Sequence, residues 1–190
     1  MSYLVREIKP HFERTIDPLL TLLAKAHVNP NAITLLGLVF VIIGSVFLYR
    51  HMYFWSFVFL ALGGLADAID GSLARKSGTR SDFGAFLDSL VDRFSDALPF
   101  IAISLSAEER YLSFLSLLAL VFSFGVSYAK ARAEGLGHTL NVGTFERTER
   151  WLTLLVGVAL NMIEISVFVI LFGSLITVLQ RVFAFKRQLK

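Results

Sequence analysis

The sequence predicts an all-α integral membrane protein with six transmembrane helices. Hydrophobic residues make up 55% of the 190 residues and charged residues only 17%, whereas soluble domains carry about 25% charged residues. Long charge-free stretches recur along the chain, and together they are too long for the core of one small soluble domain. With six spans, both termini lie on the same side of the membrane. All of the 18 Lys and Arg residues except Arg50, Arg93 and Arg110 then fall on that side. The positive-inside rule therefore places both termini in the cytoplasm.

Joining the apolar stretches across a few acidic residues defines the expected spans. Eighteen helical residues rise about 27 Å, close to the ~30 Å of hydrocarbon in a bilayer. The fifth span is short by this measure. The expected spans are 32–49, 52–74, 83–106, 111–130, 149–163 and 165–185. We accordingly divide the chain into an N-terminal amphipathic, juxtamembrane segment, 1–31, and a six-helix membrane domain, 32–190.

Short local signals indicate where helices begin. Asp17-Pro18 is typical of an N-cap followed by the first helical residue, and the leucines after it predict an amphipathic helix in the membrane interface. Asn29-Pro30 repeats this signal before the first span. Ser81 is expected to cap the third span.

Composition excludes two kinds of site. The chain has no Cys, which rules out disulfides and thiolate metal sites. The net charge is +3, but the basic residues do not gather on one soluble face. We therefore expect no nucleic-acid partner.

Four aspartates lie inside the second and third predicted spans, where an ionised carboxylate costs at least ~2.5–3.5 kcal/mol on insertion scales. They are Asp67, Asp70, Asp88 and Asp92. Residues three or four apart share a helix face, so each pair forms one acidic face. The two spans are consecutive and joined by a short turn, so the faces can meet in a pocket open to the cytoplasmic leaflet. Oxygen ligands favour Mg²⁺, with Mn²⁺ as a possible substitute, and bound Mg²⁺ often contacts substrate phosphate.

Small residues flank these aspartates, and their simplest interpretation is close helix packing. Written out, however, the segment reads Asp67-x2-Asp70-Gly71-x2-Ala74-Arg75-x8-Gly84-x3-Asp88-x3-Asp92. This pattern resembles the signature of the CDP-alcohol phosphatidyltransferase family (class I). The stretch from Asn29 to Thr34 also resembles the family's entry to its first span, and the resemblance covers nearly the whole chain.

The resemblance implies a homodimeric membrane enzyme of phospholipid biosynthesis. Such enzymes transfer a phosphatidyl or archaetidyl group from CDP-diacylglycerol or CDP-archaeol to an alcohol and release CMP. Asp67, Asp70 and Asp88 would hold the metal, and Asp92 would share it and act as the general base. The CDP donor would bind at Asp67, Asp70, Gly71, Ala74, Arg75 and Gly84.

Basic residues near the ends of the last three spans bear on the acceptor. They are Lys130, Arg132, Arg147, Arg150 and Arg181. Several cations around a cavity suit a phosphorylated acceptor, although cytoplasmic helix ends also gather Lys and Arg for topology alone. The segments 130–134 and 146–150 resemble the branch that uses inositol 1-phosphate to make phosphatidylinositol phosphate or its archaeal-lipid counterpart. Glycerol 3-phosphate as the acceptor, and CDP-inositol as the donor, stay open.

Two other classes also explain intramembrane carboxylates. Intramembrane prenyltransferases bind a diphosphate through Mg²⁺, but they need more spans and two DDxxD-like blocks. A divalent-cation transporter needs polar residues along its outer half, whereas 51–66 and 97–107 contain no acidic residue. We therefore expect a multi-pass enzyme of the cell membrane, surrounded by membrane lipids, with its active site facing the cytoplasm.

Overall fold

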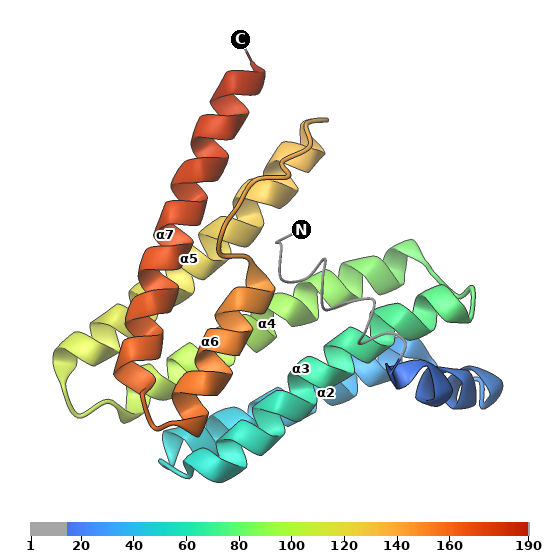
Figure 1. Ribbon diagram of the computed structural model, residues 1–190, viewed down its shortest axis with the longest axis horizontal. Coiled ribbons are helices and arrows are strands. Elements are labelled where there is room, and N and C mark those ends of the chain that lie inside the picture. The colour runs from blue at the N-terminus through green and yellow to red at the C-terminus, as the bar shows by residue number, and fades with distance from the viewer. Residues whose placement is uncertain (1–14, 190) are drawn as a thin grey trace. The chain divides into compact units, whose positions relative to one another are not determined.

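The computed structural model describes residues 15–189, and this part of the chain is helical with no strand. The prediction of an all-α protein is confirmed. The first 14 residues of the predicted N-terminal segment, with Arg6, Lys9 and Arg14, lie outside the described residues. A helix covers residues 15–25, and the helices labelled in Figure 1 follow it. They are α2 (Pro30–Tyr49), α3 (Tyr53–Lys76), α4 (Asp82–Ser106), α5 (Arg110–Gly135), α6 (Arg147–Ala159) and α7 (Ile163–Gln188).

Four of the described helices are long and apolar enough to cross a membrane. These are α2, α3, α5 and α7, with mean hydropathies of 2.5, 1.5, 1.9 and 2.1. Helix α4 has 25 residues but carries several charged side chains. Helix α6 has only 13 residues, a rise of about 20 Å. The structure thus supports four of the six predicted spans by length and composition, and the six-span topology stays a prediction.

The predicted fifth span, 149–163, is wrong at both ends. Helix α6 starts at Arg147 because Glu146 and Glu149 form a capping box, in which the Glu146 amide donates to Glu149 Oε2 at 3.0 Å. It ends at Ala159, and Asn161 follows in the left-handed region with φ 56°. Asparagine tolerates this conformation, so the chain turns there and α7 starts early, at Ile163.

The helix of residues 15–25 is amphipathic, as predicted. Leu20 packs with Ile69 and Leu73 of α3, whereas Leu22 is 64% exposed. The prediction that Asp17 caps this helix is wrong, because residues 15 and 16 are already helical. The Asp17 carboxylate instead accepts a hydrogen bond from Lys76 at the end of α3, with Nζ to Oδ1 at 2.6 Å.

The other two predicted caps are confirmed. Asn29 Oδ1 accepts a hydrogen bond from the Asn31 amide at 2.9 Å and starts α2. Ser81 Oγ accepts one from the Gly84 amide at 3.0 Å and starts α4.

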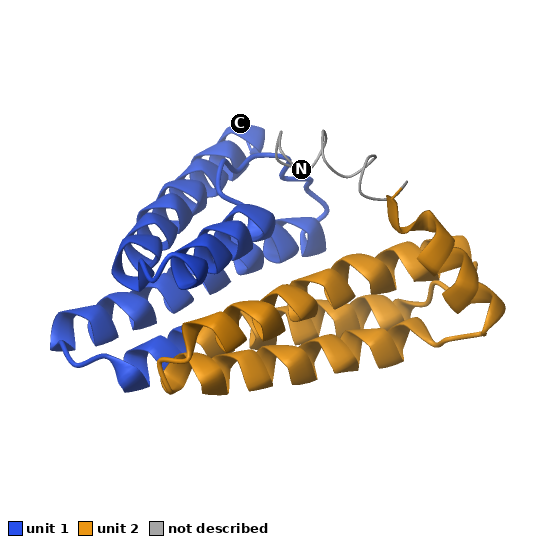
Figure 2. Ribbon diagram, turned by 60° about the horizontal axis from the view of Figure 1, so that its bottom comes forward, with its two compact units in different colours: residues 1–5, 100–190 blue, residues 6–99 orange. Residues whose placement is uncertain are grey.

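The chain forms two compact units, shown in different colours in Figure 2. One unit is 6–99 and contains the helix of residues 15–25, α2, α3 and most of α4. The other, within the described residues, is 100–189, and it contains the last turns of α4 with α5, α6 and α7. Helices α2 and α3 pack against each other in the first unit, and α7 packs against both α5 and α6 in the second.

Glycines hold α2 and α3 at close range. A Cβ atom on Gly63 would lie 2.5 Å from Val41 Cγ2 and 3.2 Å from the Gly37 carbonyl oxygen. One on Gly44 would lie 2.9 Å from the backbone nitrogen of Leu60. Because glycine has no side chain, the two backbones can approach closely, and this close approach increases the van der Waals contact between the helices within a membrane. This seam sets the register of α2 along α3.

Gly63→Ala is expected to destabilise the protein. Val41 is buried, so the new methyl group cannot be accommodated without separating α2 from α3, at a cost of about 1–3 kcal/mol. The neighbouring Gly64→Ala is the matched control, because a Cβ atom there meets nothing within 4 Å. Thermal unfolding in detergent should show a lower midpoint for Gly63→Ala and an unchanged or slightly higher one for Gly64→Ala. Equal midpoints for the two variants would contradict the tight seam.

Candidate active site

Three of the four predicted aspartates form one cluster. Asp67 of α3 and Asp88 and Asp92 of α4 each present a carboxylate oxygen, and these oxygens lie within 4.8 Å of one another. The spacing predicted that the acidic faces of these helices meet, and for these three side chains they do. All three lie in the unit 6–99.

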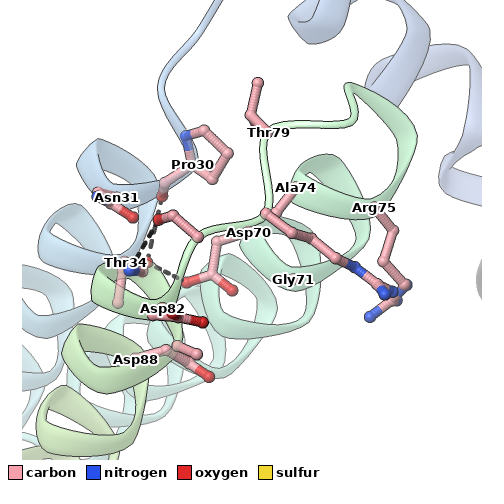
Figure 3. A pocket seen from close by; sticks show the side chains of 14 residues that line it. Pro30, Asn31, Thr34, Asp70, Gly71, Ala74, Arg75, Thr79, Asp82 and Asp88 are labelled. Atoms are coloured by element: carbon pink, nitrogen blue, oxygen red, sulfur yellow. Dashed lines mark hydrogen bonds between the residues drawn. The ribbon is translucent and has the colours of Figure 1, made fainter.

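Asp70 lies outside this cluster of three and lines a pocket next to it. The pocket has a volume of about 500 Å³, and Figure 3 shows it from close by. Asp88 belongs both to the carboxylate cluster and to the pocket wall. The remaining wall comes from the start of α2, the end of α3, the turn between α3 and α4, and the start of α4. It consists of Pro30, Asn31, Thr34, Gly71, Ala74, Arg75, Thr79, Arg80, Ser81, Asp82, Gly84 and Ala85.

Thr34, for which the sequence predicted no role, contacts Asp70 directly. Its hydroxyl donates to Asp70 Oδ2 at 2.5 Å, and both side chains are buried. Figure 3 shows this bond as a dashed line. The available signal was the stretch from Asn29 to Thr34 at the entry to the first span. Asp82 was also missed as a pocket residue.

The five predicted acceptor residues lie in the other unit. Lys130 and Arg132 are in the last turns of α5, Arg147 and Arg150 in the first turn of α6, and Arg181 in α7. Of these, Arg150 and Arg181 are buried.

The Arg181 guanidinium donates three hydrogen bonds within its own unit. Nε donates to the Val142 carbonyl oxygen at 3.0 Å, Nη2 to Glu146 Oε1 at 3.2 Å, and Nη1 to the Val126 carbonyl oxygen. Arg181 thereby ties α7 to α5 and to the segment that precedes α6. These bonds use three of the five N–H groups of the guanidinium.

Comparison with known proteins shows to which family the chain belongs. The sequence profile of the CDP-alcohol phosphatidyltransferase family matches residues 27–183. The chain belongs to this family. The resemblance seen in the sequence is confirmed, and the protein is an integral membrane enzyme of the transferase class.

Three relatives narrow its position within the CDP-alcohol phosphatidyltransferases. The archaetidylinositol phosphate synthase of Pyrococcus horikoshii is 34% identical over 98% of this chain and 99% of its own. The phosphatidylinositol phosphate synthase of Streptomyces avermitilis is 33% identical over 93% of this chain and 80% of its own. The crystal structure of the Mycobacterium tuberculosis phosphatidylinositol phosphate synthase with CDP-DAG bound matches with a TM-score of 0.82 and 28% identity, over 90% of this chain and 94% of that one. The same enzyme in complex with manganese and citrate matches with a TM-score of 0.80.

The carboxylate cluster fits a divalent cation. Three carboxylate oxygens so close together repel one another unless some of the groups are protonated or a cation neutralises them. Hard ions such as Mg²⁺ and Mn²⁺ take oxygen ligands of this kind. Together with membership of the CDP-alcohol phosphatidyltransferase family, the cluster indicates a divalent metal ion as the cofactor.

The other residues of the family signature line the pocket, each with its own local contacts. A Cβ atom on Gly84 would lie 3.1 Å from Asn31 Oδ1, so Gly84 lets the start of α4 approach the start of α2. Arg75 donates from Nη2 to Ser72 Oγ at 2.7 Å. Gly71 and Ala74 leave the wall between Asp70 and Arg75 without bulky side chains, so they keep the pocket open.

Proposed function

We propose that this protein transfers a phosphatidyl or archaetidyl group from CDP-diacylglycerol or CDP-archaeol to inositol 1-phosphate and releases CMP. The observation that carries the proposal is that Asp88 belongs both to the carboxylate cluster and to the wall of the pocket. A diphosphate in this pocket would lie beside the cation site. The names of the relatives from Pyrococcus and Streptomyces support an inositol phosphate acceptor.

In this proposal Asp67, Asp70, Asp88 and Asp92 would hold Mg²⁺, or Mn²⁺ in its place, which would supply positive charge against the diphosphate and the departing CMP. The Asp92 carboxylate accepts the proton of the acceptor hydroxyl. The hydroxyl oxygen forms a bond to the phosphorus that carries the lipid alcohol, and the bond from that phosphorus to CMP breaks. Gly71, Ala74, Arg75 and Gly84 shape the donor site together with Asp67 and Asp70.

We assign the phosphate of the acceptor to the cationic residues Lys130, Arg132, Arg147, Arg150 and Arg181. Arginine suits this role because its planar N–H groups pair with two phosphate oxygens at once. Arg181 is held by backbone carbonyls of Val126 and Val142, so it is preorganised. Its two remaining N–H groups are the ones we assign to the acceptor.

The proposal includes a topology and an assembly. All six helices from α2 to α7 cross the membrane as the domain 32–190, both termini and the active site face the cytoplasm, and the protein is a homodimer in the cell membrane. The distribution of Lys and Arg supports this orientation. The amphipathic helix of residues 15–25 lies along the membrane surface.

The experiment is incubation of the purified protein with Mg²⁺ and CDP-diacylglycerol, with inositol 1-phosphate and glycerol 3-phosphate offered in parallel. We expect CMP release and a phosphatidylinositol phosphate product with the first acceptor. Turnover only with glycerol 3-phosphate would identify a phosphatidylglycerophosphate synthase. Turnover only when CDP-inositol replaces CDP-diacylglycerol would show that CDP-inositol is the donor. Cation flux in proteoliposomes without CMP release would instead indicate a transporter.

A further inference from the structure

Thr34 lies where the close contact between α2 and α3, made at Gly37, Gly44 and Gly63, reaches the pocket. On α2 it stands one turn before Gly37, and its partner Asp70 stands one turn after Ala66 on α3. A Cβ atom on Gly37 would lie 3.1 Å from Ala66 Cβ, so the two helices are in close contact immediately beside this pair. The start of α2 is also fixed, since Asn29 caps it and Pro30 presets its first turn. The Thr34 hydroxyl is therefore held in one place relative to α3.

The bond from Thr34 to Asp70 has the geometry of a charge-assisted hydrogen bond. Its oxygen-to-oxygen distance is 2.5 Å, within the 2.5–2.7 Å range typical of a hydroxyl donating to a carboxylate. The Thr34 hydroxyl also lies 3.2 Å from the Pro30 carbonyl oxygen, a longer and weaker alternative for its single proton. Thr34 thus contacts Asp70 Oδ2, and Asp70 and Asp88 both line the pocket (Figure 3).

We infer that Thr34 is a positioning residue for the cation site, because it fixes the Asp70 carboxylate so that one oxygen is directed to the metal. The inference rests on the proposed function only in taking Asp70 as a metal ligand. Thr34 also lines the pocket, and in this assignment it acts on the cation through Asp70. Groups that orient metal ligands in this way account for about 10- to 100-fold in metal affinity.

The test is direct binding of Mn²⁺ to the purified protein in detergent without any CDP-lipid, followed by electron paramagnetic resonance of the free ion. Thr34→Val keeps the shape of the side chain and removes the donor, and Thr34→Ser keeps the donor. We expect the Kd for Mn²⁺ to rise about 10- to 100-fold in Thr34→Val and to return close to the wild-type value in Thr34→Ser. Thr34→Ala is prepared in parallel, so that a variant lacking the donor is measured even if valine prevents folding.

The matched control is Thr153→Val in α6. The Thr153 hydroxyl donates to the Glu149 carbonyl oxygen at 2.8 Å, an ordinary bond within one helix, so Mn²⁺ affinity should not change. Thermal unfolding without metal separates a loss of stability from a loss of affinity. An unchanged Kd in the donor-less variants, a weakened Kd that serine does not restore, or no Mn²⁺ binding by the wild-type protein would each overturn the inference. If the wild-type protein released no CMP but Thr34→Val still bound Mn²⁺ more weakly than wild type, the inference would be upheld and the proposed function rejected.

Discussion

Asp92→Asn is expected to abolish turnover while leaving CDP-diacylglycerol bound. Asparagine keeps the shape and one oxygen of the side chain, so the cluster with Asp67 and Asp88 retains its ligand positions. It cannot accept the proton of the attacking hydroxyl, and a positioned general base contributes about 10²- to 10⁴-fold to the rate. The measurements are kcat from CMP release and the Kd of CDP-diacylglycerol in the presence of Mg²⁺.

Glu164→Gln is the control for Asp92→Asn. It also neutralises one carboxylate, but Glu164 lies in the first turn of α7, where it accepts a hydrogen bond from Tyr111 at 2.7 Å. Its kcat should equal that of the wild-type protein. Full activity of a folded Asp92→Asn variant would remove Asp92 from the role of base, and loss of donor binding would mean that it serves mainly as a metal ligand.

Asp88→Asn is expected to remove metal binding and, with it, metal-dependent binding of the donor. Asp88 is the one residue that joins the carboxylate cluster to the pocket. Unlike Asp92, Asp88 lines the pocket as well as the cluster, so loss of its charge affects both the cation and the donor. We expect the Kd for Mn²⁺ to rise by at least about 100-fold, since groups that merely orient a ligand already account for about 10- to 100-fold. Titration of Mn²⁺ with and without CDP-diacylglycerol measures both effects.

Asp17→Asn is the matched control for this second variant. Asp17 lies in the same unit and loses its ion pair with Lys76, an exposed pair worth at most about 1 kcal/mol. Its Mn²⁺ affinity should be that of the wild-type protein. If Asp88→Asn bound Mn²⁺ as tightly as Asp17→Asn, the assignment of the cluster as the cation site would be wrong.

The sequence predicted the helices well where local signals were strong. Asn29 and Ser81 cap α2 and α4 as expected, because an N-cap depends on a few adjacent residues. The prediction was less accurate for α6, which was expected over 149–163 and covers Arg147–Ala159. There the Glu146 and Glu149 side chains close a capping box, so these charged residues begin the helix.

Prediction of the site was less complete. The spacing of the four aspartates indicated two acidic faces, and the structure brings Asp67, Asp88 and Asp92 together but gives Asp70 a different partner. The bond from Thr34 to Asp70 joins residues 36 positions apart. No periodicity within either helix specifies which side chain of α2 faces Asp70.

The amino-acid sequence alone determined the apolar helices, the acidic faces and the family, because hydrophobic period, charge and motif spacing are properties of neighbouring residues. Only the tertiary structure decided which oxygens converge, that Thr34 holds Asp70, and that Arg181 is held by Val126 and Val142. These contacts depend on the depth and register at which helices pack. For α2 and α3 that register is set by the close approach at Gly37, Gly44 and Gly63.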